Sequence, residues 1–225
     1  MSEGFRIKKS WPRISADLVE KFRPLPVANV SDCMARMDAG GCDLRPMHRE
    51  GVLAGPAFTV RTRPGDNLML HKAIDMAQPG DVIVCDAGGD VTNSLMGELM
   101  LVHAVRRGVA GFVLTGSIRD RQAFLEENLP VYALGVTHRG PYKDGPGEIG
   151  FPIGLGGMVV CPGDLILGDI DGVIVVPRIS AEGILQRVQS KHQAEGRQME
   201  AIRNGTVDRA WVDKALAEKG CEFVD

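Results

Sequence analysis

The chain has 225 residues, of which 44% are hydrophobic, so it can bury a sizeable core as one domain or as a domain with an appendage. Its 26 basic and 29 acidic side chains give a formal net charge of -3, which removes the usual electrostatic reason to expect nucleic-acid binding. No apolar run approaches the roughly 20 residues needed to cross a bilayer, and the first residues lack the apolar core of a signal peptide. We therefore expect a soluble, cytoplasmic protein with no membrane partner.

The cysteine and glycine contents constrain the fold further. The five cysteines, at positions 33, 42, 85, 161 and 221, are odd in number and show no C-x-x-C spacing. This pattern argues against a disulfide framework or a zinc knuckle, and we expect most of the thiols to be buried. The 28 glycines cluster between apolar runs, which predicts many tight turns.

The first 37 residues are predicted to form an arm and two short helices. Residues 1–12 are expected to be a loose arm. Ser15 can cap an amphipathic helix that ends at Phe22, shortly before a proline. A second helix is predicted over residues 26–37, with apolar side chains that include Met37 packed into the core.

A strand and a helix are predicted next. The strand covers residues 51–62, where Gly55-Pro56 would mark a bulge or an edge. Asp66 then caps a helix that carries His71 and Asp75 one turn apart. A carboxylate one turn away can orient an imidazole, so His71 is a candidate site residue, and a structural or exposed position is the alternative.

A second strand is predicted over residues 81–86, followed by a glycine turn and a helix over about 93–107. Gly97 falls inside this helix, where glycine costs about 1 kcal/mol relative to alanine. This indicates that the helix begins near Gly97 with its first N–H groups free, beside Glu98. The turn does not match G-x-G-x-x-G, and no G-x-x-x-x-G-K-[ST] occurs, so a nucleotide-binding fold is disfavoured.

The stretch from Gly111 to Asp120 is the centre of the functional prediction. An apolar strand ends at Gly116, and the pair Arg119-Asp120 follows at the opening of the next helix. Ligands of α/β sheets collect at such a turn because backbone donors and the positive end of a helix face one crevice. Arg119 can bind a carboxylate with two N–H groups, and Asp120 can hold a hard divalent cation. A surface ion pair is the simpler alternative.

The second half alternates before it turns to β-rich structure. A helix to about residue 128 and a strand from residue 131 favour an α/β core with right-handed connections. Short apolar runs over residues 156–177, joined by Pro-Gly and Asp-Gly turns, predict hairpins. The Gly- and Pro-rich segment 137–148 is expected to be a loop at a pocket mouth that selects the far end of a substrate, or else a solvated surface excursion.

Six motifs occur in order along the chain. They are Asp66-Asn67 with His71, Gly80-Asp81-Val82, Gly97-Glu98-Leu99, the run from Arg107 to Asp120, Pro162-Gly163-Asp164, and Gly168 to Val173. In order and spacing, the chain from about Val27 to Arg203 resembles the RraA-like family. This family includes the metal-dependent 4-hydroxy-4-methyl-2-oxoglutarate / 4-carboxy-4-hydroxy-2-oxoadipate aldolases.

The resemblance implies a fold, an assembly and an activity. The implied fold class is α/β, and the implied fold is the β/β/α sandwich of the RraA-like family over residues 1–179. A helical C-terminal extension over residues 180–225 would follow it. The implied assembly is a homotrimer or a homohexamer with sites between adjacent subunits. The implied activity is that of a class II (pyruvate) aldolase, which uses Mg²⁺ or Mn²⁺ to cleave small 4-hydroxy-2-oxo acids to pyruvate and which also decarboxylates oxaloacetate.

The resemblance also implies residue roles. Arg119 would bind the substrate's carboxylate or keto oxygen and offset the enolate charge, and Asp120 would hold the metal directly or through water. His71 would lie at the pocket wall, and Glu195 matches an acid that a neighbour's C-terminal helix supplies. The substrate carboxylate would be received by the backbone N–H groups of Gly97, Glu98, Leu99 and Met100. Asn93 stands where some aldolases carry an acid, so the metal's outer shell is expected to differ.

Two other functions compete with the aldolase. Cleavage beside a ketone needs a Schiff-base lysine or a Lewis-acid metal, and no lysine before residue 190 ends an apolar strand, which favours the metal. A non-catalytic RraA-type regulator that binds a ribonuclease is the main alternative. The presence of Arg119-Asp120 and of a long C-terminal extension favours the enzyme. A methyltransferase is disfavoured because no glycine-rich nucleotide turn occurs.

Overall fold

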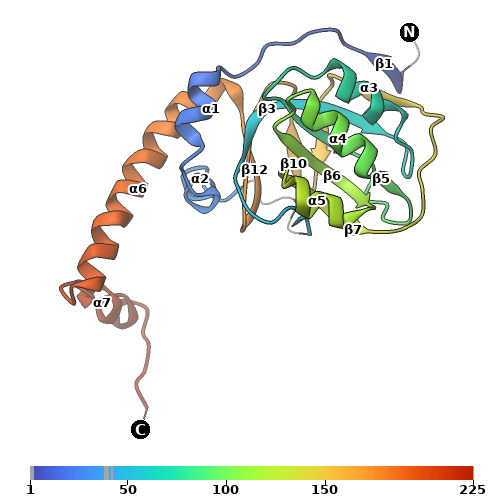
Figure 1. Cartoon of the computed structure of the whole chain (residues 1–225). Coiled ribbons are helices and arrows are strands. Elements are labelled where there is room, and N and C mark those ends of the chain that lie inside the picture. The colour runs from blue at the N-terminus through green and yellow to red at the C-terminus, as the bar shows by residue number, and fades with distance from the viewer. Residues whose placement is uncertain (1–2, 38–40, 42, 225) are drawn as a thin grey trace. The chain divides into compact units, whose positions relative to one another are not determined.

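The computed structural model describes residues 3–37, 41 and 43–224. The chain divides into two compact units, residues 1–188 and 189–225 (Figure 1). The first unit holds the strands and six of the described helices, including the beginning of α6. The second unit holds the rest of α6 and all of α7.

The first unit is built on a mixed sheet. Its strands are β1 (Phe5–Ile7), β2 (Arg45–Pro46), β3 (Leu53–Thr62), β4 (Val82–Asp86), β5 (Ser94–Met96), β6 (Gly111–Ile118), β7 (Val131–Val136), β8 (Gly147–Ile149), β11 (Leu165–Asp169) and β12 (Gly172–Val176). The main path runs β1-β8-β3-β4-β6-β7-β2, with β3, β4, β6 and β7 mutually parallel. A separate hairpin joins β9 (Ile153–Leu155) to β10 (Met158–Val160).

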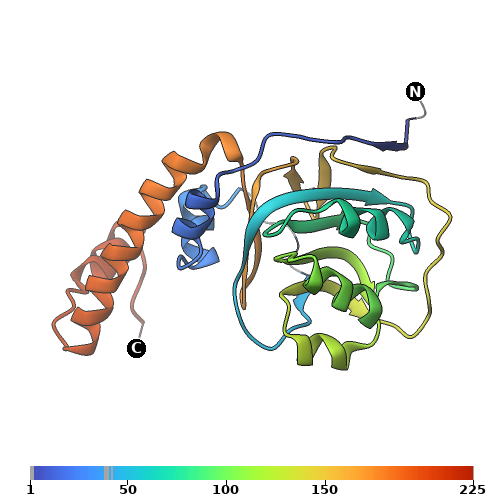
Figure 2. The same cartoon turned by 45° about the horizontal axis from the view of Figure 1, so that its top comes forward.

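Strand β3 connects two parts of the sheet. Residues 53–56 pair antiparallel with β11, and residues 57–61 pair parallel with β4. Figure 2 shows β3 as a long, curved strand. Gly55 and Pro56 pair with β11 on one side and with no other described strand, so they lie at an edge of the pairing, which is one of the two expected alternatives. Glycine is needed at position 55 because a Cβ there would run into the carbonyl oxygen of Gly80.

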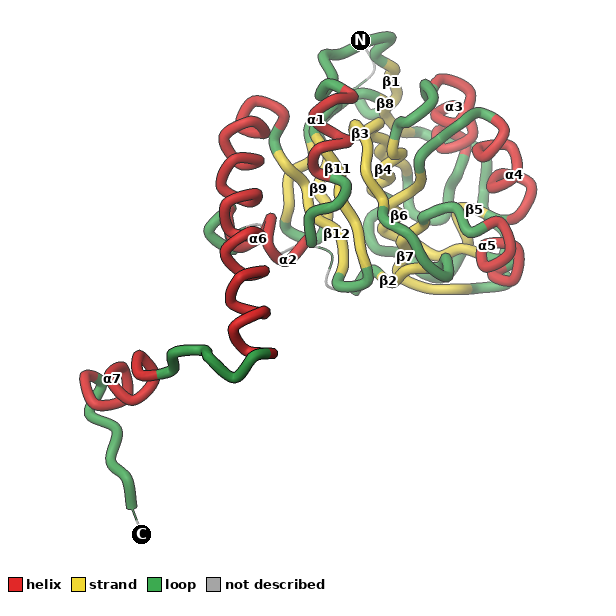
Figure 3. Tube along the Cα trace, turned by 60° about the vertical axis from the view of Figure 1, so that its left-hand side comes forward, coloured by secondary structure: helices red, strands yellow, loops and turns green. Residues whose placement is uncertain are grey.

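The described helices are α1 (Ala16–Phe22), α2 (Val27–Cys33), α3 (Leu68–Met76), α4 (Glu98–Arg106), α5 (Arg121–Glu127), α6 (Ala181–Arg203) and α7 (Ala210–Glu218), with a 3-10 turn at Arg178–Ser180. Those from α1 to α5 cover opposite faces of the strands. Figure 3 shows α3, α4 and α5 on the side of the strands opposite α1 and α2. The chain therefore forms the expected β/β/α sandwich, followed by C-terminal helices.

Alternation along the parallel strands produces two hydrophobic cores. Ile83 and Phe112 face the cluster that contains α3, α4 and α5, whereas Val82 and Val113 face the cluster that contains α1, α2 and β9 to β12. Full burial of one such side chain contributes about 1.5–3 kcal/mol, against about 0–1 kcal/mol for an exposed ion pair. Apolar packing between the layers therefore dominates stability.

Two expectations for the N-terminal region are wrong. Residues 5–7 are not part of a loose arm, because they form β1 and pair parallel with β8. Helix α2 ends at Cys33, since Ala35 and Arg36 have φ of 60° and 58°, which an α-helix does not accommodate. Met37 is 82% exposed and is not a core residue.

The cysteines also differ from expectation. The four that the structure describes are free thiols, but only Cys85 among them is buried, while Cys161 and Cys221 are exposed. Cys33 is half-buried, and Cys42 lies outside the described residues. Burial is therefore not the rule for the described thiols.

The C-terminal helices differ in burial along their length. Ala181, Ile184, Leu185 and Val188 of α6 are buried within the first unit, whereas no residue of α7 is buried. Along the chain, the boundary between the two compact units falls after residue 188. The expected boundary between an α/β domain and a helical extension, at residue 180, stays a prediction. In the part of the chain that the structure describes, no helix combines the length and the apolar character that spanning a membrane requires.

Candidate active site

The site lies where β6 ends and three helices begin. Short strand β5 pairs with the last residues of β6, and the backbone N–H of Arg119 donates to the carbonyl of Met96 at 2.9 Å. This register places Gly97, at the start of α4, beside the turn that leads into α5. The expected helix over residues 93–107 is therefore wrong for residues 94–96, and the indication that a helix begins near Gly97 is confirmed.

A cavity of about 90 Å³ opens at this position. Its lining comes from α3, β5, α4, the turn after β6 and the loop that follows β7. The lining residues are Asn67, His71, Ser94, Leu95, Met96, Gly97, Leu99, Met100, Arg119, Asp120, Pro141 and Lys143. The structure thus brings six of the eight candidate residues to one pocket, although their chemical roles stay predictions.

Arg119 and Asp120 form an open pair at the pocket. The Nε atom of Arg119 lies 3.7 Å from Oδ2 of Asp120, and the two side chains are 44% and 45% exposed. The same Oδ2 accepts a hydrogen bond of 3.1 Å from the backbone N–H of Glu98. Oδ1 of Asp120 has no donor among the described residues, so it remains available to a ligand or cation.

The backbone at Asp120 is in the left-handed region, with φ 56° and ψ 41°. Asp and Asn adopt this conformation more readily than most residues, but it remains uncommon outside glycine. Such strain persists only where surrounding contacts hold it, and here the Glu98 N–H holds the carboxylate.

Gly97 permits this close arrangement. A Cβ at position 97 would lie 2.5 Å from Oδ2 of Asp120 and 3.1 Å from Nε of Arg119. Real Cβ atoms do not come this close to another atom, so a side chain at position 97 would force the Asp120 carboxylate or α4 to shift. The requirement is steric, because φ of Gly97 is -143°, which any residue can adopt.

The first turn of α4 supplies free donors. Its N-cap, Gly97, provides no side-chain cap, and the N–H groups of Leu99 and Met100 have no acceptor among the described residues. First-turn N–H groups have no acceptor within their own α-helix and carry the positive end of its dipole. They can therefore receive an anion, and the expected binding of a substrate carboxylate there stays a prediction. The side chain of Glu98 is exposed and does not line the cavity.

His71 lines the pocket wall, but its expected partner does not orient it. Oδ1 of Asp75 lies 3.2 Å from Nε2 of His103 on α4, so that carboxylate is engaged elsewhere. Burial, and after it the charge of Lys143, lowers the pKa of the His71 imidazole below its usual 6.5. His71 is therefore neutral at pH 7 and can accept a proton.

Asn67 presents an unpaired acceptor. The side chain is 2% exposed, and its Nδ2 donates to the carbonyl of Leu95 at 2.9 Å. Its buried Oδ1 has no hydrogen-bond partner among the described residues. A buried acceptor without a donor is costly, and Asn67 is one of the residues that line the cavity.

The structure adds pocket residues that the sequence reasoning did not single out. Pro141 and Lys143 belong to the Gly- and Pro-rich loop, which does reach the pocket, although selection of the substrate's far end stays a prediction. The glycines and prolines around them predicted a loop but not which side chain would reach the pocket. Asn93 donates through Nδ2 to the carbonyl of Gly140 and so supports this loop.

Glu195 is not among the residues that line the cavity. It lies on α6 in the second unit and pairs with Lys191, with 2.8 Å between Oε1 and Nζ. Its expected role requires a neighbouring chain and stays a prediction.

A metal would have to be held with few protein ligands. Within the described part of the chain, no three His, Cys, Asp or Glu side chains gather as a ready-made metal cluster. Mg²⁺ commonly retains several waters and takes one or two carboxylates together with substrate oxygens. Oδ1 of Asp120 suits this mode of binding.

Comparison with known proteins gives a consistent assignment. The model of the RraA-like family, described as Aldolase/RraA, matches residues 27–175. A protein of Halalkalibacterium halodurans named "Putative 4-hydroxy-4-methyl-2-oxoglutarate aldolase" is 38% identical over 201 residues, which cover 89% of this chain and 96% of that protein.

Solved structures agree at the level of fold. An uncharacterized protein from Pseudomonas syringae pv. tomato superposes with a TM-score of 0.78 at 26% identity, covering 88% of this chain and 97% of that one. RraAS2 from Streptomyces coelicolor, described as an unusual member of the RNase ES inhibitor RraA protein family, gives a TM-score of 0.76 at 26% identity. That match covers 83% of this chain and 98% of RraAS2.

Proposed function

Because the chain belongs to the RraA-like family, we propose that it is a divalent-metal-dependent class II (pyruvate) aldolase. Its substrates are 4-hydroxy-2-oxo acids such as 4-hydroxy-4-methyl-2-oxoglutarate, and it also decarboxylates oxaloacetate. The observation that carries the proposal is the convergence of Arg119, Asp120 and the open first turn of α4 on one cavity. The name of the Halalkalibacterium halodurans relative supports the same reaction.

The first step is binding of the 2-oxo acid between the first turn of α4 and Arg119. The N–H groups of Leu99 and Met100 receive the C1 carboxylate of the 2-oxo acid, where the dipole of α4 favours an anion. The Arg119 guanidinium then faces the C2 keto oxygen. Asp120 would hold Mg²⁺ or Mn²⁺ through Oδ1, directly or through water, and the cation would supply a Lewis acid for the developing enolate.

Cleavage requires a proton to leave the C4 hydroxyl. As the C3–C4 bond breaks, its electron pair moves to C3 and the keto oxygen, and the C4 fragment departs as a carbonyl compound. Arg119 stabilises the resulting enolate oxygen by charge and hydrogen bonding, which in a preorganised site amounts to several kcal/mol. Protonation at C3 then gives pyruvate.

The pocket contains groups that can handle the protons. Neutral His71 can accept one, since burial and the charge of Lys143 lower its pKa. Oδ1 of Asn67 can accept from the C4 hydroxyl and so orient it. Glu195 of a neighbouring chain is proposed to complete the water network, within a homotrimer or homohexamer.

The direct test is pyruvate release from 4-hydroxy-4-methyl-2-oxoglutarate and from oxaloacetate, with Mg²⁺ or with EDTA. Turnover is expected with Mg²⁺, and Arg119→Ala and Asp120→Ala are each expected to lower kcat/KM at least about 100-fold. Exposed Arg121, the next residue on α5, provides the matched control, and Arg121→Ala should retain activity. Turnover that resists EDTA, or that survives both substitutions, contradicts the proposal.

A second candidate is a non-catalytic regulator that binds a ribonuclease. The similarity to RraAS2, whose description names an RNase ES inhibitor family, favours it. Under this alternative the purified protein releases no pyruvate and lowers the activity of an added ribonuclease E-type enzyme. Arg119→Ala would leave that inhibition unchanged if the pocket has no part in it.

A further inference from the structure

We propose that Lys143 forms a second anion subsite, which receives the distal carboxylate of a dicarboxylic 2-oxo acid, and that buried Asp66 is the positioning residue that holds Lys143 at the pocket. The inference rests on the proposed function, because it takes Arg119 and α4 as the seat of the 2-oxo acid group. It goes further by assigning the residue that distinguishes dicarboxylic from monocarboxylic ligands.

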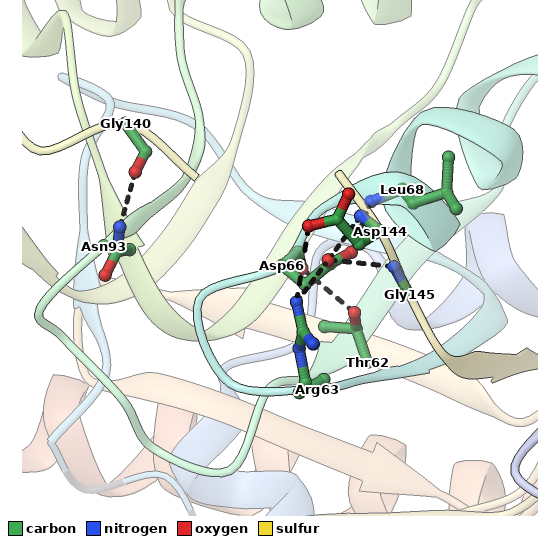
Figure 4. A network of polar contacts seen from close by, with 8 residues as sticks. All are labelled: Thr62, Arg63, Asp66, Leu68, Asn93, Gly140, Asp144 and Gly145. Carbon is green, nitrogen blue, oxygen red and sulfur yellow. Dashed lines mark hydrogen bonds and ion pairs between the residues drawn. The ribbon is translucent and has the colours of Figure 1, made fainter. Parts of the chain in front are cut away.

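Asp66 is a hub of hydrogen bonds at the start of α3. Its side chain is fully buried, and Oδ1 accepts from the N–H of Leu68 at 2.9 Å. Oδ2 accepts from the N–H groups of Asp144 and Gly145 at 2.7 and 2.9 Å and lies 3.2 Å from Nη2 of Arg63. Figure 4 shows these donors converging on one carboxylate. Asp66 therefore ties the loop after β7 to α3.

The same tie fixes the backbone on both sides of Lys143. The N–H of Tyr142 donates to the carbonyl of Gly65 at 2.9 Å, and the carbonyl of Tyr142 accepts from the backbone N–H of Asn67 at 3.0 Å. Asp144, on the other side, donates to Asp66. Since both neighbours are held, the Cα of Lys143 has little freedom to move.

A second anchor holds the beginning of the loop. The carbonyl of Arg139 accepts from the N–H and Oγ of Ser94 at 2.8 and 3.0 Å. Nδ2 of Asn93 donates to the carbonyl of Gly140, which Figure 4 shows apart from the Asp66 hub. The two anchors bracket the residues through which the loop lines the cavity.

The charges around the pocket leave Lys143 without an acidic partner. Arg119 has Asp120 at 3.7 Å, whereas Lys143 forms no ion pair with any residue that the structure describes. His71 is uncharged at neutral pH, so it adds no cation. The lining therefore offers two cations and one carboxylate, and the exposed ammonium group of Lys143 is free to donate a charge-assisted hydrogen bond to a second anionic group of a ligand.

Ligand binding tests this without turnover. Isothermal titration calorimetry with Mg²⁺ would compare 2-oxoglutarate with 2-oxobutyrate, which lacks only the distal carboxylate. Neither carries the 4-hydroxyl that cleavage requires. The full-length protein is expected to bind 2-oxoglutarate roughly tenfold more tightly, and Lys143→Met should abolish that preference while Lys143→Arg retains it. Lys72→Met, which removes an exposed lysine of α3, is the matched control and should keep it.

Asp66 is tested by the same preference. Asp66→Asn removes acceptor capacity at the hub, so the preference for 2-oxoglutarate over 2-oxobutyrate should fall severalfold. The double variant Asp66→Asn with Lys143→Met should show the same preference as Lys143→Met alone. If Asp66→Asn shows no cooperative thermal unfolding, Asn93→Ala, which releases the other anchor, replaces it with the same expected result.

The outcomes separate the two proposals. A wild-type protein that binds both acids equally or neither, or a Lys143→Met variant that keeps the preference, overturns the subsite. An Asp66→Asn variant that folds and retains the full preference overturns the positioning role. A protein that shows the Lys143-dependent preference but releases no pyruvate contradicts the aldolase and leaves the subsite standing.

Discussion

At the scale of single residues, buried His48 makes stability depend on pH. Its side chain is 7% exposed, its Nδ1 lies 3.2 Å from the backbone N of Val131, and burial lowers its pKa below 6.5. A proton therefore binds the unfolded chain more readily than the folded one. The stabilisation is complete above about pH 6.5 and is lost as pH falls through the lowered folded-state pKa.

The variant His48→Gln isolates this contribution. The free energy of unfolding of the wild type should fall more steeply below pH 6.5 than that of the variant, by a slope that corresponds to at most about one proton. Urea unfolding at a series of pH values measures both slopes. Parallel curves for the two proteins would show that His48 does not titrate in this way.

Local signals explain which site residues the sequence could predict. Arg119 and Asp120 follow an apolar strand, and Gly97 interrupts an expected helix, so each stands at a position that short-range patterns identify. Asp66 binds the loop through residues 78 and 79 positions away, and no local pattern encodes such a contact. The same holds for His103, whose contact with Asp75 overturned the expected His71 pairing.

At the scale of elements, the approach of α4 to the turn after β6 should control activity. Gly97→Ala introduces a Cβ 2.5 Å from Oδ2 of Asp120, which must displace the carboxylate or the helix. We expect kcat/KM to fall at least about tenfold, because small misplacements of catalytic groups are costly. The midpoint of thermal unfolding should change by only a few degrees, since the clash lies in an open pocket.

The control is Gly183→Ala in α6, where a Cβ would lie 3.7 Å from Nη1 of Arg187 in ordinary contact. It should leave activity unchanged and raise stability slightly, because alanine favours a helix interior. Equal activity in Gly97→Ala and wild type would show that the close approach is not required.

Elements were predictable where periodicity was clear. The strands around residues 83 and 113 and the hairpins β9–β10 and β11–β12 carry apolar runs. Ser15 caps α1 through a 3.3 Å hydrogen bond from the N–H of Leu18, as expected. Strand β1 was missed because three residues in an arm gain their structure from pairing with β8, a tertiary effect. Helix α2 was overextended because the left-handed turn at Ala35 and Arg36 has no glycine to signal it.

At the scale of the whole molecule, the proposed sharing of sites between subunits can be tested by mixing two variants. Arg119→Ala alters the pocket, and Glu195→Gln alters the residue expected to come from a neighbour. Each variant alone should have low activity. After co-refolding in equal amounts, random assembly should restore about a quarter of wild-type activity, because one in four sites receives both intact residues.

A mixture that stays as inactive as its components would indicate that Glu195 acts within its own chain or not at all. Size-exclusion chromatography with light scattering on the wild type then distinguishes a homotrimer from a homohexamer. The number of subunits could not be predicted from the sequence, because either assembly depends on contacts with the surface of a second copy of the chain.

The most direct test of the central claim is pyruvate release from oxaloacetate as a function of free Mg²⁺, for wild type and Asp120→Asn. Wild-type activity should vanish in EDTA and rise to saturation with Mg²⁺, whereas Asp120→Asn should need at least about tenfold more Mg²⁺ or stay inactive, with thermal unfolding unchanged. Full wild-type turnover in EDTA, or the same Mg²⁺ dependence in both proteins, would contradict a cation held at Asp120.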